Sequence, residues 1–225
     1  MLTVGNDAAG VERMLEEGSL ACPACGGRLA RWGHARPRVV FGPGRKGREV
    51  RPRRSRCAGC GKTHVLLAAR LLLRRADEAG VIGAALAAAG RGAGHRRIAG
   101  ELGVPEDTVR GWLRRAAGRA GRLREVFTKV AAAVSADPVP LDPAGSLLGD
   151  ALVAVAAAAA AVAGRWPRLL TVSPWEVASA VTNATLLSPV MAARAFNASP
   201  QKMPVGSRSI SRSRSSIRGE GASRS

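Results

Sequence analysis

All four cysteines of the chain lie in two Cys-x-x-Cys pairs, Cys22 with Cys25 and Cys57 with Cys60. Thiolates at this spacing are typical ligands of a tetrahedral zinc site. Two redox-active dithiols, or unrelated free cysteines, are the alternative. Because two pairs are present and no cysteine is left over, the pattern favours one Zn²⁺ ion held by Cys22, Cys25, Cys57 and Cys60.

Small residues follow each pair, as a metal knuckle requires. Gly26 and Gly61 come directly after the second cysteines and allow backbone N–H groups to approach the sulfurs. His34 and His64 are possible substitute ligands. With four cysteines available, we expect both histidines to lie on the surface or to contact phosphate.

The 31 residues between the pairs contain strand-like pieces, "RLARWG", "RPRVVF" and "REVRPRRSR", which "GPGRKG" interrupts. This pattern predicts a zinc ribbon over residues 20–66, preceded by an N-terminal extension over 1–19. A segment of this length buries too little surface to fold alone, and we therefore expect a bound metal to supply its stability. "GPGRKG" matches G-x-G-x-x-G, but no helix pattern follows it, so we interpret it as a hairpin turn.

The segment "GHRRIAGELGVPEDTVRGWLRR", residues 94–115, has the pattern of two short helices joined by a tight turn. Gly103 provides the positive φ that the turn needs, and Asp107 or Thr108 could cap the second helix. With an upstream helix over 76–89, the pattern predicts a homeodomain-like helix-turn-helix over residues 70–120. An ordinary αα-hairpin is the alternative. The predicted buried positions are Ile98, Ala99, Leu102, Val104, Val109, Trp112 and Leu113.

The second helix of this unit has arginines on its polar side. Arg110 and Arg114 are one turn apart, and arginine suits bidentate contact with guanine in the major groove. Gly111 between them would allow close approach. Arginines of the ribbon would contact phosphates without reading sequence. The predicted DNA-contacting residues are Arg96, Arg97, Thr108, Arg110, Gly111, Arg114, Arg115, Arg51, Arg53 and Arg54.

Charge is concentrated where these motifs lie. The 225 residues have a formal net charge of +19. Residues 22–75 contain fifteen Lys or Arg against one acid, whereas 130–200 contain three against four acids. The four tryptophans are the large aromatics available for a core, because the chain has no Tyr and only three Phe. The basic first half is typical of a protein that binds a polyanion.

The remaining residues predict a helical C-terminal half. A Pro-rich linker over 137–146 precedes an Ala-rich helical segment over 147–190. A first helix over 147–163 has a narrow apolar seam, which would pack on its own domain or form a homodimer. Ser173 and Glu176 predict a capping box for a second helix that ends near residue 188. Residues 200–225 have the composition of a disordered basic tail.

Targeting signals are not evident in the sequence. The start is acidic, and the longest apolar run, residues 151–163, is short for a membrane span. We therefore expect a cytoplasmic, nucleoid-associated protein without a membrane partner, in a compartment where thiols stay reduced.

The stretch from "CPAC" through "RSRCAGCGKTHVLL" to "GHRRIAGELGVPEDTVRGWLRR", about residues 22–117, resembles small regulatory proteins of bacterial insertion sequences. It is also similar to proteins of actinobacterial type with the same layout that accompany mobile elements. The resemblance implies sequence-specific DNA binding tied to transposition or its repression. It covers under half of the chain, and the C-terminal half has no counterpart in that family.

The expected fold is mainly α, with a small N-terminal β zinc ribbon, a three-helix helix-turn-helix unit and a C-terminal helical segment. The carboxylates after residue 117 are scattered and predict no catalytic cluster, so we expect no enzyme. The expected function is sequence-specific binding of double-stranded DNA, as a transcriptional regulator or mobile-element accessory factor. The alternatives are the DNA-recognition subunit of a transposase, integrase or recombinase with a separate catalytic chain, and an RNA-binding ribbon protein.

Overall fold

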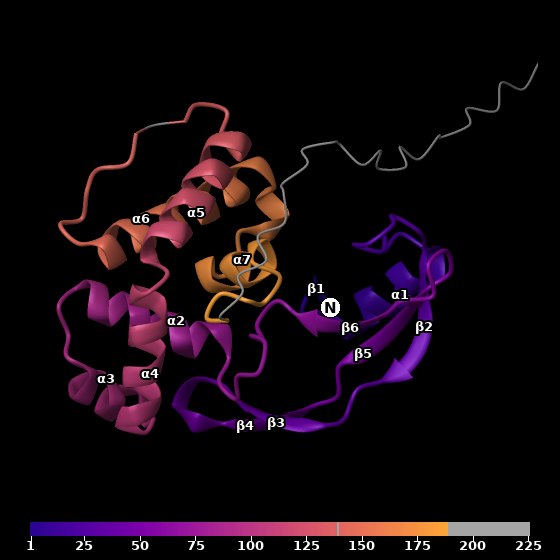
Figure 1. Cartoon of the computed structure of the whole chain (residues 1–225), viewed down its shortest axis with the longest axis horizontal. Helices are drawn as coiled ribbons and strands as arrows, with labels where there is room; N and C mark the ends of the chain where they lie inside the picture. The colour runs from indigo at the N-terminus through magenta and orange to yellow at the C-terminus, as the bar shows by residue number, and fades with distance from the viewer. Residues whose placement is uncertain (139, 189–225) are drawn as a thin grey trace, which may run out of the picture.

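A computed structural model describes residues 1–138 and 140–188 of the chain. A small sheet with one helix lies on one side of the molecule, and a group of helices lies on the other (Figure 1). Helices predominate among the described residues, as expected for a mainly α chain with a small N-terminal sheet. The predicted basic tail over 200–225, and positions 189 and 190 of the predicted Ala-rich segment, lie outside the described residues.

The N-terminal residues are part of the sheet. The sheet order is β1-β6-β5-β2, with β1 parallel to β6 and the other pairs antiparallel. Helix α1 packs Val11 and Leu15 into the same small core as Leu29 and Leu66. Residues 1–19, predicted as an extension, therefore belong to this sheet and its core. The elements are β1 (Leu2–Val4), α1 (Ala8–Glu17), β2 (Leu29–His34), β5 (Arg53–Cys57) and β6 (Thr63–Ala68).

The residues between β2 and β5 form a separate hairpin of β3 (Arg38–Phe41) and β4 (Gly47–Val50). "GPGRKG" is its turn, as predicted, and contains the short 3₁₀ helix η1 (Pro43–Arg45). Backbone hydrogen bonds join Phe41 to Ala76 and Glu78, at 2.7 and 3.0 Å. The Arg45 guanidinium pairs with the Asp77 carboxylate at 2.6 Å. The hairpin is thereby fixed to the start of the helical part.

Helices α2 (Ala79–Gly90), α3 (His95–Leu102) and α4 (Glu106–Ala117) pack together. Gly103 ends α3 with φ 62°, as its position in the sequence predicted. Of the seven predicted core residues, Leu102 and Leu113 are half-buried. The other five are buried: Ile98, Ala99, Val104, Val109 and Trp112. The predicted cap is wrong, because α4 begins at Glu106 after Pro105, so Asp107 and Thr108 lie inside its first turn.

The C-terminal half belongs to the same core. Helices α5 (Ala120–Val134), α6 (Leu147–Arg165) and α7 (Pro174–Val181), with the 3₁₀ helix η2 (Pro167–Leu169), share one apolar cluster with α2, α3 and α4. Residues 137–146 contain no helix or strand where they are described. The capping box of Ser173 and Glu176 is confirmed. The second helix ends at Val181, before the predicted end near 188.

Helix α6 uses its apolar seam within the chain. Val155, Ala159 and Val162 are buried in the shared core, and α6 packs along α5. This is the arrangement in which the Ala-rich helix packs on its own domain. With 19 residues, α6 meets the length and composition of a helix that could cross a membrane. The unbroken apolar run noted in the sequence, residues 151–163, is shorter than the helix. Its buried positions pack against other helices of the same chain.

Candidate metal centre and basic surfaces

Two similar loops present the four cysteines. In the first, the Gly26 N–H donates to the Cys22 carbonyl at 2.9 Å, and Gly26 has φ 74°. In the second, the Gly61 N–H donates to the Cys57 carbonyl at 3.0 Å, and Gly61 has φ 70°. Glycine is favoured at such positive φ values because it has no Cβ. Local sequence thus turns both thiols of each pair toward the same side.

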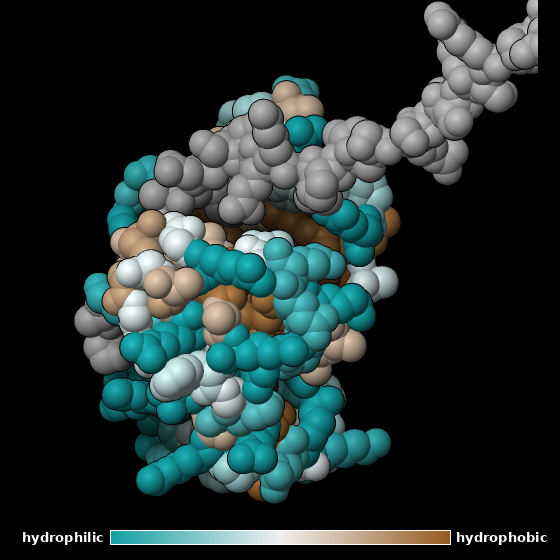
Figure 2. All heavy atoms as spheres, turned by 90° about the vertical axis from the view of Figure 1, so that its right-hand side faces the viewer, coloured by the Kyte–Doolittle hydropathy of each residue, from teal (hydrophilic) through white to brown (hydrophobic). Residues whose placement is uncertain are grey.

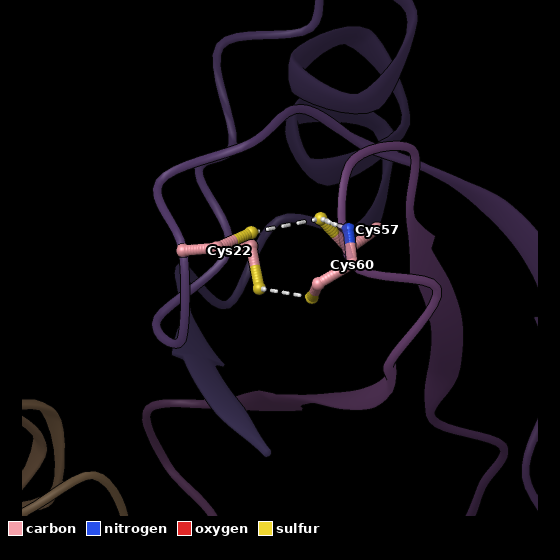
Figure 3. A group of neighbouring side chains, drawn as sticks. Cys22, Cys57 and Cys60 are labelled. Carbon is pink, nitrogen blue, oxygen red and sulfur yellow. Dashed lines mark hydrogen bonds between the residues drawn. The ribbon is translucent and has the colours of Figure 1, made fainter.

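The four sulfur ligand atoms lie within 4.8 Å of one another. The Sγ atoms of Cys25 and Cys57 are 3.4 Å apart, and those of Cys22 and Cys60 are 3.7 Å apart. Figure 3 shows the labelled thiols turned toward one another from the two loops. Four sulfurs at about 2.3 Å from a central zinc would be about 3.8 Å apart at tetrahedral angles. The cluster, formed by the predicted residues, could therefore hold a metal ion.

The backbone around the sulfurs leaves room for this cluster. A Cβ at Gly27 would lie 3.0 Å from the Cys57 sulfur and 3.4 Å from the Cys25 sulfur. A side chain there would press on two of the four sulfurs. Among the described residues, no other group of three or more His, Cys, Asp or Glu could share a metal ion.

The electrostatics favour thiolate at some positions and oppose it at others. The Cys60 N–H donates to the Cys57 sulfur and lowers the pKa of Cys57 to about 6, although burial opposes the shift. The Gly27 N–H favours a Cys25 thiolate, but the sulfurs of Cys57 and Cys60 raise the pKa of Cys25 to about 11. Burial raises the pKa of Cys22, but N–H donors of Ala24 and Cys25 outweigh it and lower that pKa. A cation among the sulfurs would favour all four thiolates together.

His64 lies next to the cluster, which the sequence interpretation missed. Its ring is buried, and Nε2 is 3.4 Å from the Cys22 sulfur. The expectation of a surface or phosphate-contacting His64 is therefore wrong. The signal was its position on β6, where alternation with the buried Leu66 places it on the inner face. His34 is exposed, as expected.

Arginines cover the outer side of α3 and α4. Arg96 and Arg97 are exposed, and their guanidinium groups pair with Glu106 at 3.6 Å and Glu101 at 2.8 Å. Arg110 is exposed, pairs with Asp107 at 2.9 Å, and has its Nη2 3.3 Å from Nε2 of His95. Arg114 is exposed, and no ion pair to it is found within the described residues. These four arginines of α3 and α4 are therefore exposed, and three of them pair with nearby acids.

Three other predicted contacts on α4 are less accessible. Gly111 is buried, because the Arg115 side chain lies over it and donates to its carbonyl at 2.9 Å. Arg115 and Thr108 are half-buried. The expectation that Gly111 would let DNA approach closely is wrong, since a side chain of the same helix occupies that space.

The predicted arginines of the ribbon differ in their surroundings. Arg51 is exposed between β4 and β5, and Arg54 is half-buried on β5. The Arg53 side chain is only 17% exposed, its Nε lies 2.8 Å from the Glu12 carboxylate, and its Nη1 donates to the Gly33 carbonyl at 3.2 Å. Arg53 therefore joins α1 to the sheet, and the prediction that it contacts phosphate does not fit its position.

A cavity of about 280 Å³ lies within the N-terminal part of the chain. It lies between the β4–β5 corner and the strands β1 and β6, and both acids and bases line it, among them Glu12, Glu49, Arg48 and Arg70. The mixed charge does not indicate a ligand of either sign.

Comparisons with known proteins identify no relative. No protein-family model, no curated protein and no solved structure matches the chain.

Proposed function

We propose that the chain is a zinc-dependent, sequence-specific DNA-binding protein that reads duplex DNA with α4. One observation carries the proposal. Val109 and Trp112 are buried on the inner side of α4, while Arg110 and Arg114 are exposed on its outer side, one turn apart. Two guanidinium groups at this spacing could donate to guanine edges in the major groove.

The proposed helix-turn-helix consists of α3 and α4, with α2 as the supporting helix. Gly103 in the left-handed conformation and the buried Ala99 and Val104 support this assignment, because the turn needs a positive φ and close helix packing. Arg96 and Arg97 at the start of α3 would contact the phosphate backbone. Their present partners, Glu106 and Glu101, are exposed, so these pairs are weak and could yield to phosphates.

Two acids lie at the start of α4. Glu106 and Asp107 lie in the first turn of α4, where the positive end of the helix dipole stabilises their negative charge. The same negative charge would repel phosphates. Arg96 and Arg110 pair with them and offset part of that charge. We therefore place base contacts one turn further along, at Arg110 and Arg114.

Zinc is the metal that the donor set favours. Four cysteine sulfurs near tetrahedral spacing suit Zn²⁺ in a closed, structural site. In this proposal the metal holds the two loops together and so fixes β5, which carries Arg54 and begins just after Arg51. These two arginines form a sequence-blind clamp on phosphates, without Arg53.

Binding-site selection from random duplexes, with the full chain loaded with zinc, tests the proposal. We expect enrichment of a short motif, and loss of preference at one base pair with Arg110→Ala. Arg122→Ala is a matched control, because Arg122 is an exposed arginine on α5 that pairs with Glu125. Selection that returns no motif would contradict sequence-specific reading. The resemblance to insertion-sequence proteins adds a mobile-element setting, as regulator or as partner of a transposase, to this proposal.

A further inference from the structure

Near the cysteine loops one face of the four-stranded sheet is exposed, whereas further along β6 the same face is covered at Leu67, which packs with Val40 and Ala184. Helix α1 covers the opposite face, where Leu29, Cys57 and Leu66 are buried. Across β2, β5 and β6, Ala30 is paired with Arg56, and Arg56 with Thr63, so these three residues point to the other face. All three are exposed. Figure 2 shows mostly hydrophilic residues on the side of the molecule where the sheet lies.

Trp32 is an exposed aromatic residue on this side of the sheet. It was one of the aromatics expected in the core, but it is 49% exposed. It lies at an irregularity in β2, where the register with β5 shifts between Arg31 and His34 and Gly33 has φ 83°. Bulges of this kind redirect side chains and often lie near functional sites.

Arg56 holds one side of the indole. Its Cζ lies over the Trp32 ring, 4.8 Å from the ring centroid. The Arg56 Nε donates to the Gly61 carbonyl at 3.3 Å, which fixes the guanidinium beside the second cysteine loop. The cation beside the ring is therefore held by the same loop that carries Cys57 and Cys60.

The charge on this face is of one sign. Arg54 and Arg56 belong to it through their places on β5, and no carboxylate pairs with either among the described residues. The acids of α1 lie across the sheet, where Glu12 and Glu16 pair with Arg31 and Arg53. An anionic ligand would therefore meet two unpaired guanidinium groups and an exposed ring.

We propose that this open face, formed by Trp32, Arg54 and Arg56, binds unpaired bases of single-stranded nucleic acid. Trp32 stacks on a base, and the two arginines contact the flanking phosphates. Aromatic side chains on basic grooves bind single strands in this way because every base has a π-face. A base within a duplex has both faces covered by its neighbours, so the ring selects for unpaired or frayed strands.

The inference shares its partner class, nucleic acid, and one residue, Arg54 of the phosphate clamp, with the proposed function, but its stacking residue Trp32 lies outside α4 and outside that clamp. It would let the chain hold a melted strand beside the duplex that α4 reads. Its test must therefore separate base stacking from general attraction to phosphate, and the sheet face from α4.

The experiment compares two fluorescein-labelled 12-mers of equal charge, oligo(dT) and an abasic strand, with the zinc-loaded full chain at fixed salt. The native chain should bind oligo(dT) more tightly than the abasic strand. Trp32→Ala should weaken oligo(dT) binding about fivefold to a hundredfold and remove the difference between the two strands. Trp32→Phe should retain most of the difference. Arg54→Ala and Arg56→Ala should weaken binding to both strands.

The controls distinguish a local effect from unfolding and from failure of the α4 proposal. Metal content and far-ultraviolet circular dichroism of each variant report whether the ribbon is intact. Arg110→Ala should leave the preference for oligo(dT) unchanged, and Trp32→Ala should leave duplex binding unchanged. Equal binding of oligo(dT) by the native chain and by folded Trp32→Ala, or equal affinity of the native chain for both strands, would overturn the inference. Absence of a selected duplex motif would instead contradict the role of α4.

Discussion

The indole ring of Trp175 lies directly on Gly83. A Cβ built at Gly83 would come within 2.0 Å of the Cδ2 atom of the ring, and two further ring atoms would be within 2.2 Å. The contact joins α2, which supports the proposed reading helix, to α7 in the C-terminal half. A glycine within a helix normally costs stability, and here its lack of a side chain makes the packing possible.

Gly83→Ala should destabilise the chain by about 1–3 kcal/mol, because the added methyl group must displace the central atoms of a packed ring. Gly80→Ala is the matched control on the same helix. A Cβ there meets nothing within 4 Å, so it should stabilise the chain by about 0.5–1 kcal/mol. Urea denaturation followed by circular dichroism measures both. A stability order in which Gly83→Ala equals or exceeds Gly80→Ala would contradict this contact.

Cys57→Ser should abolish stoichiometric metal binding and loosen the sheet, because the cluster loses a buried sulfur whose thiolate form its backbone donor favours. The native chain, purified without chelator, should contain one metal ion, measured by elemental analysis. His34→Ala is the control and should keep its metal, since His34 is exposed on the strand outside the cluster. A metal-free native chain with a folded sheet would disprove the metal centre.

His64→Leu should lower metal affinity about tenfold to a hundredfold without removing the site, which is the usual effect of losing a group that contacts a ligand. The buried ring can donate from Nε2 to the Cys22 sulfur, 3.4 Å away, and leucine cannot. His64→Gln, which restores an N–H donor, should recover part of the affinity. Competition with a chromophoric chelator measures the change, and equal affinity of all three proteins would show that His64 only fills space.

Arg110→Ala should cost about 1–3 kcal/mol on the selected duplex and flatten preference at one base pair, because Arg110 is proposed to contact a base edge. Fluorescence anisotropy on the selected site and on single-base variants measures both effects. Uniform weakening across all sites would assign Arg110 to the phosphate backbone instead.

Arg51→Ala should weaken binding to all duplexes alike and reduce the slope of log affinity against log salt by about one. Arg51 is exposed, so its loss should not affect folding. Arg53→Ala is the contrast, since its guanidinium joins Glu12 to the sheet and its removal should lower the stability of the ribbon. An unchanged salt slope for Arg51→Ala would remove this residue from the clamp.

Local features of the sequence determined much of the cysteine cluster and of the helix pair. Each Cys-x-x-Cys turn is closed by hydrogen bonds within a few residues, and the glycines after it are required by the turn itself. The buried side of α4 follows from helical spacing, because Val109 and Trp112 lie on one stripe whatever packs against them. The capping box at Ser173 is equally local.

Tertiary structure alone decided how these pieces are combined. The parallel pairing of β1 with β6 brings Leu2 beside Leu66, far away in sequence, so residues 1–19 could not be placed by local pattern. The exposure of Trp32 and the contact of Trp175 with Gly83 likewise depend on neighbours that periodicity does not identify. Spacing along one element fixes which residues share a face. Only packing between elements decides which of those faces is covered and which remains open to a ligand.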